Sequence, residues 1–216
     1  MTAGERQRAL QGRDAGPEGA APTGDVVWRP SPAYVDGSNI KRFMDRHGIA
    51  SYEDAVARST ADVAWFWEAV AQDLGIEWAR PYDTVLDTSR GIEYPAWFLG
   101  GRLNLTHNCV DRHAAGPRRD HDALVWEGED GQVRRLTYGQ LASEVSRLVG
   151  GLRSIGVQKG DRVGVYMPMT PEAVVAMFAV AKIGAVYLPI FSGFAPGAVA
   201  ARLADAEAAA LITSDG

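Results

Sequence analysis

The densest run of reactive side chains in this chain is His107-Asn108-Cys109-Val110-Asp111-Arg112-His113. Cys109 and His113 are four residues apart, so on a helix they would share one face and could present two ligands to a metal. Two ligands do not make a structural zinc site, and a Cys–His nucleophilic pair on one short helix would lack an independently placed base. We therefore favour a structural role, in which a buried thiol lies beside polar residues that tie the helix to its surroundings.

A second candidate is the glycine-containing turn Phe191-Ser192-Gly193-Phe194-Ala195-Pro196. This turn follows a strand-like run and opens a helix. In open parallel sheets, ligands bind beyond the carboxyl ends of the strands, and helix N-termini favour anions. The chain contains neither G-x-x-x-x-G-K-[ST] nor a G-x-G-x-x-G after a strand. On these residues alone, a ligand-facing turn and a plain connecting turn both stay open, and the plain turn is favoured.

The first half of the chain, which must position the 107–113 cluster, is predicted to be helical. Ser38, Ser51 and Thr60 each precede residues with helical apolar spacing, so we expect each of them to cap a helix. Residues 76–103 contain no sustained pattern and are expected to be irregular. Asn104 is then expected to cap a short helix that contains the cluster.

The second half is predicted to begin with a β-hairpin. Strand-like runs at 123–128 and 132–137 flank Asp130-Gly131, a dipeptide that favours tight hairpins because both turn positions can need positive φ. Thr137 and Gln140 then have the spacing of a helix capping box. The apolar face of the helix that follows is formed by Leu141, Val145, Leu148, Leu152 and Ile155.

Three short apolar runs then alternate with two helices. The runs are expected to be strands at 162–167, 185–190 and 209–213, and the helices are expected to begin after Thr170 and near Pro196. Strands that are apolar throughout and alternate with helices indicate a parallel sheet with right-handed crossovers. The fold class is therefore α/β: a helical N-terminal region, a β-hairpin and a parallel βαβαβ unit. Two crossovers alone would leave one face of that sheet poorly covered.

The composition excludes several classes of protein. The chain has 216 residues, 46% of them apolar, and a formal net charge of −5, which disfavours non-specific binding to nucleic acid or anionic lipid. No apolar run approaches the roughly 18 residues that a membrane helix needs, and the first 25 residues lack the apolar core of a secretory signal. Cys109 is the only cysteine, which excludes a disulfide framework. A cytoplasmic protein is the simplest interpretation.

Several short motifs follow one another in a fixed order from residue 97 onwards. They are Trp97-Phe98-Leu99-Gly100-Gly101-Arg102-Leu103-Asn104, Asn108-Cys109-Val110-Asp111-Arg112-His113, Trp126-Glu127-Gly128, Leu136-Thr137-Tyr138, Gly160-Asp161-Arg162-Val163, Tyr166-Met167-Pro168-Met169, Pro171-Glu172-Ala173-Val174, Ile183-Gly184-Ala185-Val186 and Leu211-Ile212-Thr213-Ser214-Asp215-Gly216. This order resembles the N-terminal region of AMP-forming acetyl-CoA synthetases, which belong to the adenylate-forming superfamily. The resemblance covers roughly residues 34–216 and is more specific than any one motif in it.

The resemblance implies a two-step ligase. A small carboxylic acid attacks the α-phosphate of ATP to give an acyl-adenylate and pyrophosphate, and the thiol of CoA then displaces AMP. It implies ATP, CoA and Mg²⁺ as cofactors of the full-length family. It also places Phe191, Ser192 and Gly193 near the CoA nucleotide, and it assigns no catalytic or metal-binding residue to this chain.

This chain departs from the family pattern in ways that bear on activity. The Ser/Thr/Gly-rich ATP-phosphate loop, the Mg²⁺-binding acid and the C-terminal lysine have no counterpart, so we expect an incomplete enzyme domain that is inactive in isolation and binds no cofactor. Tyr187-Leu188-Pro189 stands where acetyl-CoA synthetases usually have His-Ser-Val, which resembles broader acyl-CoA synthetases. Ala195 replaces a usual serine and removes a helix cap worth about 1 kcal/mol.

Together these observations predict three segments: a disordered leader at 1–33, an acetyl-CoA-synthetase-type helical region at 34–115, and the truncated start of an AMP-binding domain at 116–216. The predicted function is that of an AMP-forming acid–CoA ligase for acetate or another short-chain carboxylate. One alternative is a non-catalytic interaction module whose uncovered sheet pairs with a second chain. Another is a truncated gene product derived from such an enzyme.

Overall fold

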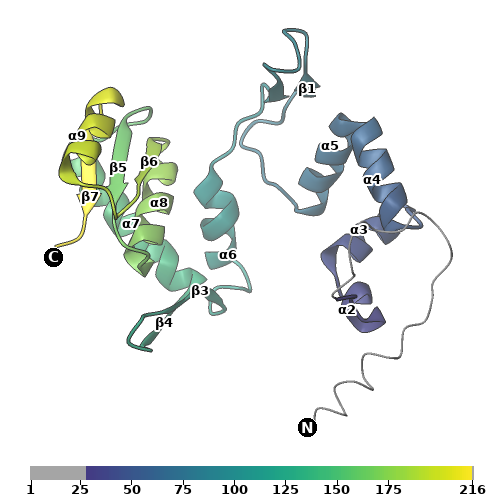
Figure 1. The fold of residues 1–216 in the computed structure, drawn as a ribbon, viewed down its shortest axis with the longest axis horizontal. Helices are drawn as coiled ribbons and strands as arrows, with labels where there is room; N and C mark the ends of the chain where they lie inside the picture. The colour runs from purple at the N-terminus through teal and green to yellow at the C-terminus, as the bar shows by residue number, and fades with distance from the viewer. Residues whose placement is uncertain (1–27, 216) are drawn as a thin grey trace. The chain divides into compact units, whose positions relative to one another are not determined.

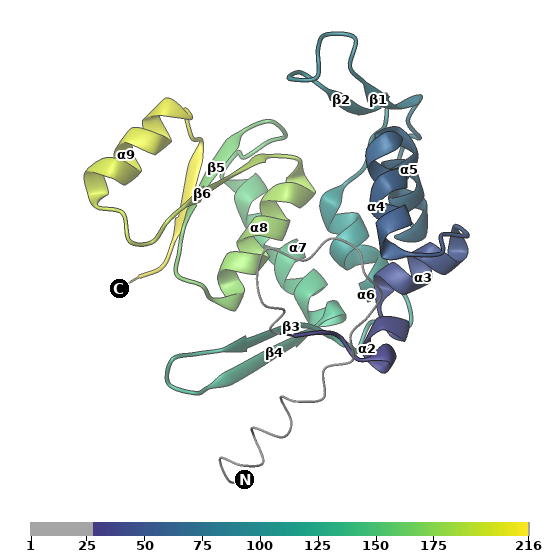
Figure 2. The same cartoon turned by 45° about the vertical axis from the view of Figure 1, so that its right-hand side comes forward.

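The computed structural model describes residues 28–215, and Figures 1 and 2 show their ribbon in two orientations. The chain divides into two compact units at the Arg58–Ser59 bond, and each is described by itself. Most of the predicted leader, residues 1–27, lies outside the described residues. At its end, residues 32 and 33 already belong to a helix.

The first unit is helical, as predicted. Its helices are α2 (Pro32–Asp36), α3 (Asn39–Arg46) and most of α4 (Tyr52–Ala61). The Ser38 hydroxyl accepts a hydrogen bond from the Lys41 N–H at 3.1 Å, and the Ser51 hydroxyl accepts one from the Asp54 N–H at 3.0 Å. Both predicted serine caps are therefore confirmed, because each satisfies an N–H group that has no partner within the helix.

The next helix, α5 (Val63–Asp73), begins at a different cap from the predicted one. Thr60 lies inside α4, and the carboxylate of Asp62 accepts the hydrogen bond from the Trp65 N–H at 2.9 Å. Aspartate caps a helix at least as well as threonine does, and Asp62 is the residue left between the two helices. The ring of Trp67 on α5 packs edge-on against Trp97, with centroids 6.2 Å apart.

Residues 76–103 were expected to be irregular, and that expectation is wrong. They contain the antiparallel strands β1 (Thr84–Asp87) and β2 (Ala96–Leu99). Arg80 and Arg102 continue the pairing with two backbone hydrogen bonds of 3.1 and 2.8 Å. Strands of four residues with half-exposed faces are too short to show a clear alternation of apolar and polar residues.

The predicted hairpin is confirmed as β3 (Asp122–Glu127) and β4 (Val133–Thr137), which pair antiparallel. The tight turn predicted within it is wrong, because residues 128–132 separate the strands. Among these five, Gly131 alone has a positive φ, of 78°, whereas a two-residue turn of this kind needs positive φ at both central positions. Two backbone bonds instead close the wider loop, from the Gly131 N–H to the Gly128 carbonyl at 2.9 Å and from the Gly128 N–H to the Gln132 carbonyl at 2.8 Å. The Asp130 carboxylate also accepts the Gln132 N–H at 3.0 Å.

Helix α7 (Tyr138–Ser154) begins with the predicted capping box between Thr137 and Gln140. The box is complete: the Gln140 N–H donates to the Thr137 hydroxyl at 3.2 Å, and the Thr137 N–H donates to the Gln140 side chain at 2.8 Å. One residue of the predicted apolar face departs from the expectation. Ile155 lies just beyond the helix end and is 70% exposed.

The predicted parallel unit is confirmed as β5 (Arg162–Tyr166), α8 (Pro171–Ile183), β6 (Val186–Ile190), α9 (Pro196–Asp205) and β7 (Ala210–Thr213). The strand order is β6-β5-β7, with both pairs parallel. The connection from β5 to β6 and the connection from β6 to β7, which passes over β5, run in opposite directions along the sheet. Right-handed crossovers therefore place α8 and α9 on opposite faces of the sheet. Figures 1 and 2 show α9 on one face and α7 and α8 on the other.

The main core lies between α7, α8 and β5. Its buried members are Val110, Leu141, Val145, Val149, Leu152, Val157, Val163, Val175, Ala179, Val180 and Ile183. Thr170 occupies the N-cap position of α8 but makes no capping hydrogen bond, so this helix start depends on Pro171 at its first position. Within residues 28–215, no helix is long and apolar enough to cross a bilayer.

Candidate functional site

The predicted turn lies at the carboxyl end of β6. The connection that leaves β5 passes to α8 and the one that leaves β6 passes to α9, on opposite faces of the sheet. Because β5 and β6 are neighbours, the turn lies beside the end of β5 at the carboxyl edge of the sheet, which is the edge where open α/β sheets bind ligands. Phe191, Ser192 and Gly193 come directly after Ile190, the last residue of β6, and all three are exposed.

The turn itself has one internal backbone hydrogen bond, from the Phe194 N–H to the Phe191 carbonyl at 3.0 Å. The rings of Phe191 and Phe194 pack edge to face with centroids 5.6 Å apart. The guanidinium of Arg202, on α9, lies 4.1 Å from the centroid of the Phe194 ring, which is cation–π geometry. The turn is therefore an exposed aromatic and cationic surface with accessible backbone.

Gly193 has a definite steric role in this turn. A Cβ atom added there would lie 2.5 Å from the Phe191 ring, well inside van der Waals contact. Glycine therefore lets the Phe191 ring cover the backbone of the turn. Any larger residue would move the ring.

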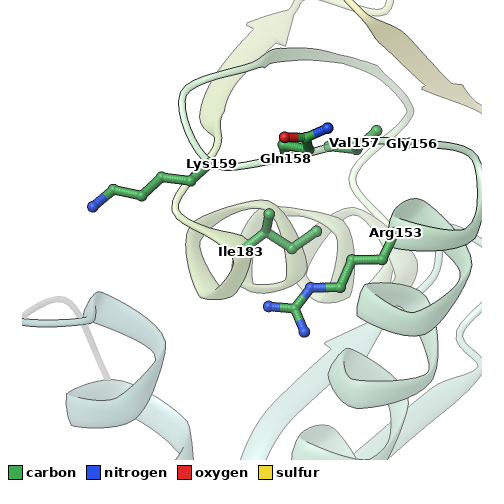
Figure 3. Close-up of a pocket in the computed structure, with 6 residues that line it drawn as sticks. All are labelled: Arg153, Gly156, Val157, Gln158, Lys159 and Ile183. Atoms are coloured by element: carbon green, nitrogen blue, oxygen red, sulfur yellow. The ribbon is translucent and has the colours of Figure 1, made fainter.

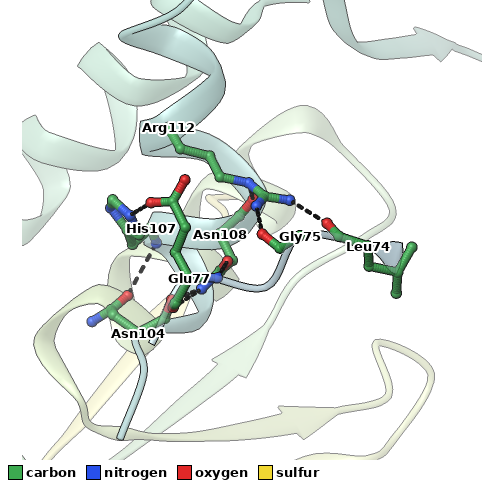
Figure 4. Close-up of polar contacts among 7 residues, drawn as sticks. All are labelled: Leu74, Gly75, Glu77, Asn104, His107, Asn108 and Arg112. Carbon is green, nitrogen blue, oxygen red and sulfur yellow. Dashed lines mark hydrogen bonds and ion pairs between the residues drawn. The ribbon is translucent and has the colours of Figure 1, made fainter. Parts of the chain in front are cut away.

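The 107–113 cluster, by contrast, has its polar groups engaged with the protein itself (Figure 4). Asn108 is 6% exposed. Its side-chain oxygen accepts the Glu77 N–H at 2.8 Å, and its amide donates to the Glu77 carbonyl at 3.0 Å. Arg112 donates to the carbonyls of Leu74, at 3.2 Å, and of Gly75, just past the end of α5. These contacts satisfy backbone groups that would otherwise be unpaired.

The same segment is bonded to the carboxyl-terminal half of α8. Thr106 is fully buried and donates to the Phe178 carbonyl at 2.7 Å. Asn104 donates to the Lys182 carbonyl at 3.1 Å and also accepts the Thr106 N–H at 2.9 Å, which confirms it as a cap. The Lys182 amine lies 2.8 Å from the carboxylate of Asp111. We call residues 104–112 the polar staple, because they join the end of α5 to α8.

Within the staple, the chain forms a π-helix, η1 (His107–Asp111), followed by α6 (Arg112–Ala114). The predicted structural role is confirmed, but the predicted burial of the thiol is wrong: Cys109 is exposed. Asn108 and Val110 of this π-helix are buried, and Cys109 between them faces solvent. His107 contacts Glu77 at 2.6 Å instead of sharing a site with Cys109. No group of three or more potential metal ligands occurs among the described residues.

His113 lies in a partly buried and electropositive part of the cluster. Burial, reinforced by the nearby charges of Arg112 and Arg118, lowers the pKa of its imidazole. Its ring packs against Tyr138 with centroids 4.9 Å apart. A neutral imidazole against an aromatic ring and two cations is a packing arrangement, since no nucleophile lies beside it for a base to activate.

A surface hollow of about 350 Å³ lies at the other end of the sheet, before β5 (Figure 3). Arg153 and Lys159 flank it, and Ile183 forms part of its floor. No lining residue is an acid, a thiol or a hydroxyl, and the amine of Lys159 is the only lining group that could act as a nucleophile or a general base.

The described residues differ in how well they fit the cofactors that the resemblance implies. The turn offers exposed aromatic rings, a cation and free backbone N–H groups, which suit a ligand rich in phosphate and amide acceptors such as CoA. ATP and Mg²⁺ find no such fit: the sequence has no phosphate-binding glycine loop, and the described residues contain no carboxylate cluster.

Comparison with known proteins decides the family. A model of the acetyl-coenzyme A synthetase N-terminus matches residues 52–109, and a model of AMP-binding enzymes matches residues 110–216. This chain belongs to the AMP-forming acyl-CoA synthetase family. The two matches are contiguous and cover all but the first 51 residues. The candidate turn therefore lies in the AMP-binding portion of the synthetase, and the polar staple spans the junction between the two matches.

Individual relatives agree with this assignment. An acetyl-coenzyme A synthetase of Streptomyces avermitilis is 46% identical over 163 residues, which are 76% of this chain and 24% of the relative. A 3-hydroxypropionyl-coenzyme A synthetase of Metallosphaera sedula is 43% identical over 169 residues, 78% of this chain and 25% of the relative. The solved structure of acetoacetyl-CoA synthetase from Streptomyces lividans superposes with a TM-score of 0.78 at 32% identity, covering 88% of this chain and 30% of the other.

Two facts follow from these comparisons. The chain spans 24–30% of the length of these relatives. The relatives are also named for three different acids, so similarity in this part of the synthetase does not single out one of them.

The sequence analysis missed two residues that the structure makes prominent. Tyr166 ends β5, and its hydroxyl lies 2.9 Å from the carbonyl oxygens of both Ser192 and Phe194. The signal available was its position, since a hydroxyl on the last residue of a parallel strand lies at the ligand edge of the sheet. Lys182 pairs with Asp111 across 71 residues of sequence, and nothing local to either residue indicates the other.

Proposed function

We propose that this chain forms part of an AMP-forming acid–CoA ligase that converts acetate or another short-chain carboxylate, ATP and CoA to acyl-CoA, AMP and pyrophosphate. Its own contribution would be the CoA-facing turn at Phe191, Ser192 and Gly193. We assign residues 34–115 to a helical N-terminal region and residues 116–216 to the start of the AMP-binding domain. ATP and Mg²⁺ would be held by residues outside this sequence, and the proposed location is the cytoplasm.

The observation that supports this proposal best is the place of the turn in the sheet. It follows β6 at the carboxyl edge of the sheet, it is exposed, and its aromatic and cationic groups come from a strand end and from α9. The polar staple, which has the more reactive side chains, has its polar groups engaged by the protein. The turn thus combines exposure with chemistry that is complementary to a nucleotide-bearing ligand.

The test has two arms with opposite expectations. In ATP–pyrophosphate exchange with acetate, propionate and butyrate, the 216-residue chain alone should give no turnover, because acyl-adenylate formation needs groups that position and neutralise the triphosphate. In a titration with CoA, the amide signals of residues 191–195 should shift, which revises the expectation from the sequence that the isolated chain binds no cofactor. Exchange activity by this chain would refute the assignment of ATP binding elsewhere, and unshifted amides would refute the CoA turn.

A second function is favoured by the exposure of the sheet. Val186 on β6 and Leu211 on β7 are 50% and 42% exposed, and both strands lie at edges of the sheet. Exposed apolar residues on open edges suit pairing with another chain, so an interaction module derived from a synthetase is the alternative. Light scattering separates the two: a monomer without dye-detectable apolar surface would rule the module out.

A further inference from the structure

The turn after β6 is linked to β5 through one side chain. The Tyr166 hydroxyl lies 2.9 Å from the Ser192 carbonyl and 2.9 Å from the Phe194 carbonyl, so it donates a hydrogen bond that the two oxygens share. Tyr166 pairs with Ile190 in the parallel register, and Ile190 is 4% exposed. The hydroxyl is therefore held by the ordered part of the sheet, while the turn it contacts is exposed.

Little else fixes this turn. Apart from the bond between the Phe194 N–H and the Phe191 carbonyl, the described residues give the stretch from Phe191 to Phe194 no other backbone hydrogen bond. The Ala195 carbonyl accepts only the first bonds of α9, from the Ala198 N–H at 2.9 Å and the Val199 N–H at 3.2 Å. Ala195 occupies the N-cap position of α9 and has no side chain with which to cap it. The Tyr166 hydroxyl is thus the only side-chain hydrogen-bond donor to the turn within the described part of the chain.

The shared bond also decides which way the backbone donors point. In a trans peptide the C=O and the following N–H lie in one plane and point in opposite directions. Because the carbonyls of Ser192 and Phe194 are directed at Tyr166, the N–H groups of Gly193 and Ala195 must be directed away from it. Neither N–H has a hydrogen-bond acceptor in the described structure.

We infer that Tyr166 is a positioning residue for CoA: its hydroxyl holds the two carbonyls against the sheet and so presents the N–H groups of Gly193 and Ala195 to acceptor oxygens of CoA. This inference rests on the proposed CoA turn and adds to it a residue that does not touch the ligand. Preorganised donors bind more tightly than donors that must be ordered on binding. The loss of the hydroxyl should therefore weaken CoA binding while the sheet keeps its packing.

The decisive variant is Tyr166→Phe in the whole chain, with Tyr187→Phe as the matched control. Tyr187 lies on the neighbouring strand β6, packs against the core and has no hydrogen bond from its hydroxyl in the described structure. CoA is titrated into each ¹⁵N-labelled protein while the amide signals of Gly193 and Ala195 are followed. Tyr166→Phe should raise the dissociation constant about three- to tenfold, as expected for one net hydrogen bond, and Tyr187→Phe should leave it unchanged.

Each other outcome is informative. Equal CoA affinity in Tyr166→Phe and the unaltered chain overturns the positioning role and leaves the CoA turn standing. Equal weakening in both variants also overturns it, because the effect would then be general loosening of the sheet. No shift in the unaltered chain refutes the CoA turn itself. Should Tyr166→Phe fail to fold, hydrogen exchange of the unaltered chain decides: the amides of Gly193 and Ala195 must exchange rapidly, and protection would overturn the inference.

Discussion

The residue types of the polar staple suggest a reactive site and those of the turn after β6 do not, but the contacts of the two segments indicate the opposite roles. The staple contains histidine, cysteine, aspartate and arginine, yet its groups bond to Glu77, to the end of α5 and to α8. The turn has no ionisable side chain, yet it is exposed at the carboxyl edge of the sheet and is held chiefly by Tyr166. The reactive residue types therefore belong to a segment with a structural role, whereas the turn, which lacks them, has the accessible backbone N–H donors.

The largest expected effect in this comparison comes from Asn108. Asn108→Ala leaves the N–H and carbonyl of Glu77 without their partners in a site that is 6% exposed, so we expect a loss of about 2–3 kcal/mol in the free energy of unfolding. Urea denaturation followed by circular dichroism measures it. Cys109→Ala, one residue along and exposed, should change stability by less than about 0.5 kcal/mol. Similar losses in both variants would contradict the structural role assigned to the staple.

The next effect compares two ion pairs, one in the staple and one beside the carboxyl edge of the sheet. Lys182 and Asp111 are each 28% exposed in their side chains, whereas Arg134 and Glu172 are 47% and 53% exposed. Double-mutant cycles with Lys182→Met and Asp111→Asn, and with Arg134→Met and Glu172→Gln, should give couplings of about 1 kcal/mol and below about 0.5 kcal/mol. A larger coupling free energy for Arg134 and Glu172 than for Lys182 and Asp111 would show that the staple does not shield its ion pair from solvent.

A substitution in the turn should change stability only slightly and CoA affinity more, which distinguishes a binding role from a folding role. In Gly193→Ala the new methyl displaces the exposed Phe191 ring, so the free energy of unfolding should change by less than about 0.5 kcal/mol, while CoA affinity should fall about threefold or more. Gly197→Ala is the control, because a Cβ there meets nothing within 4 Å and alanine favours the helix. If Gly193→Ala destabilises the chain as strongly as Asn108→Ala, the turn is structural after all.

The smallest effect is a pH dependence at the edge of the sheet. The hydrogen bond from Arg134 holds the pKa of Glu172 below its ordinary value of 4.5. A lowered folded-state pKa contributes stability that is complete above the unfolded pKa and is lost as the pH falls through the folded one. Thermal melts between pH 6 and pH 3 should therefore drop less steeply for Arg134→Met than for the unaltered chain. Parallel curves would contradict the pairing.

Local patterns predicted most of the fold. The Ser38 and Ser51 caps, the capping box at Thr137 and Gln140, and the βαβαβ unit all depend on interactions within a few residues or on the period of apolar positions. The prediction of Thr60 as a cap was wrong because two helices nearly meet there and Asp62 competes for the role. Strands β1 and β2 were missed because four half-exposed residues have too short a pattern.

The sequence by itself determined the order of elements, the parallel sheet and the place of the turn after β6, because hydrophobic periodicity, caps and chain order are local properties. Only the tertiary structure decided what the functional-looking residues do. The exposure of Cys109 depends on which sides of its helix the rest of the chain covers, and the pairing of Lys182 with Asp111 spans 71 residues. The bond from Tyr166 to the turn joins two strands separated by a helix. Such contacts arise only when packing brings distant segments together, and no local pattern specifies them.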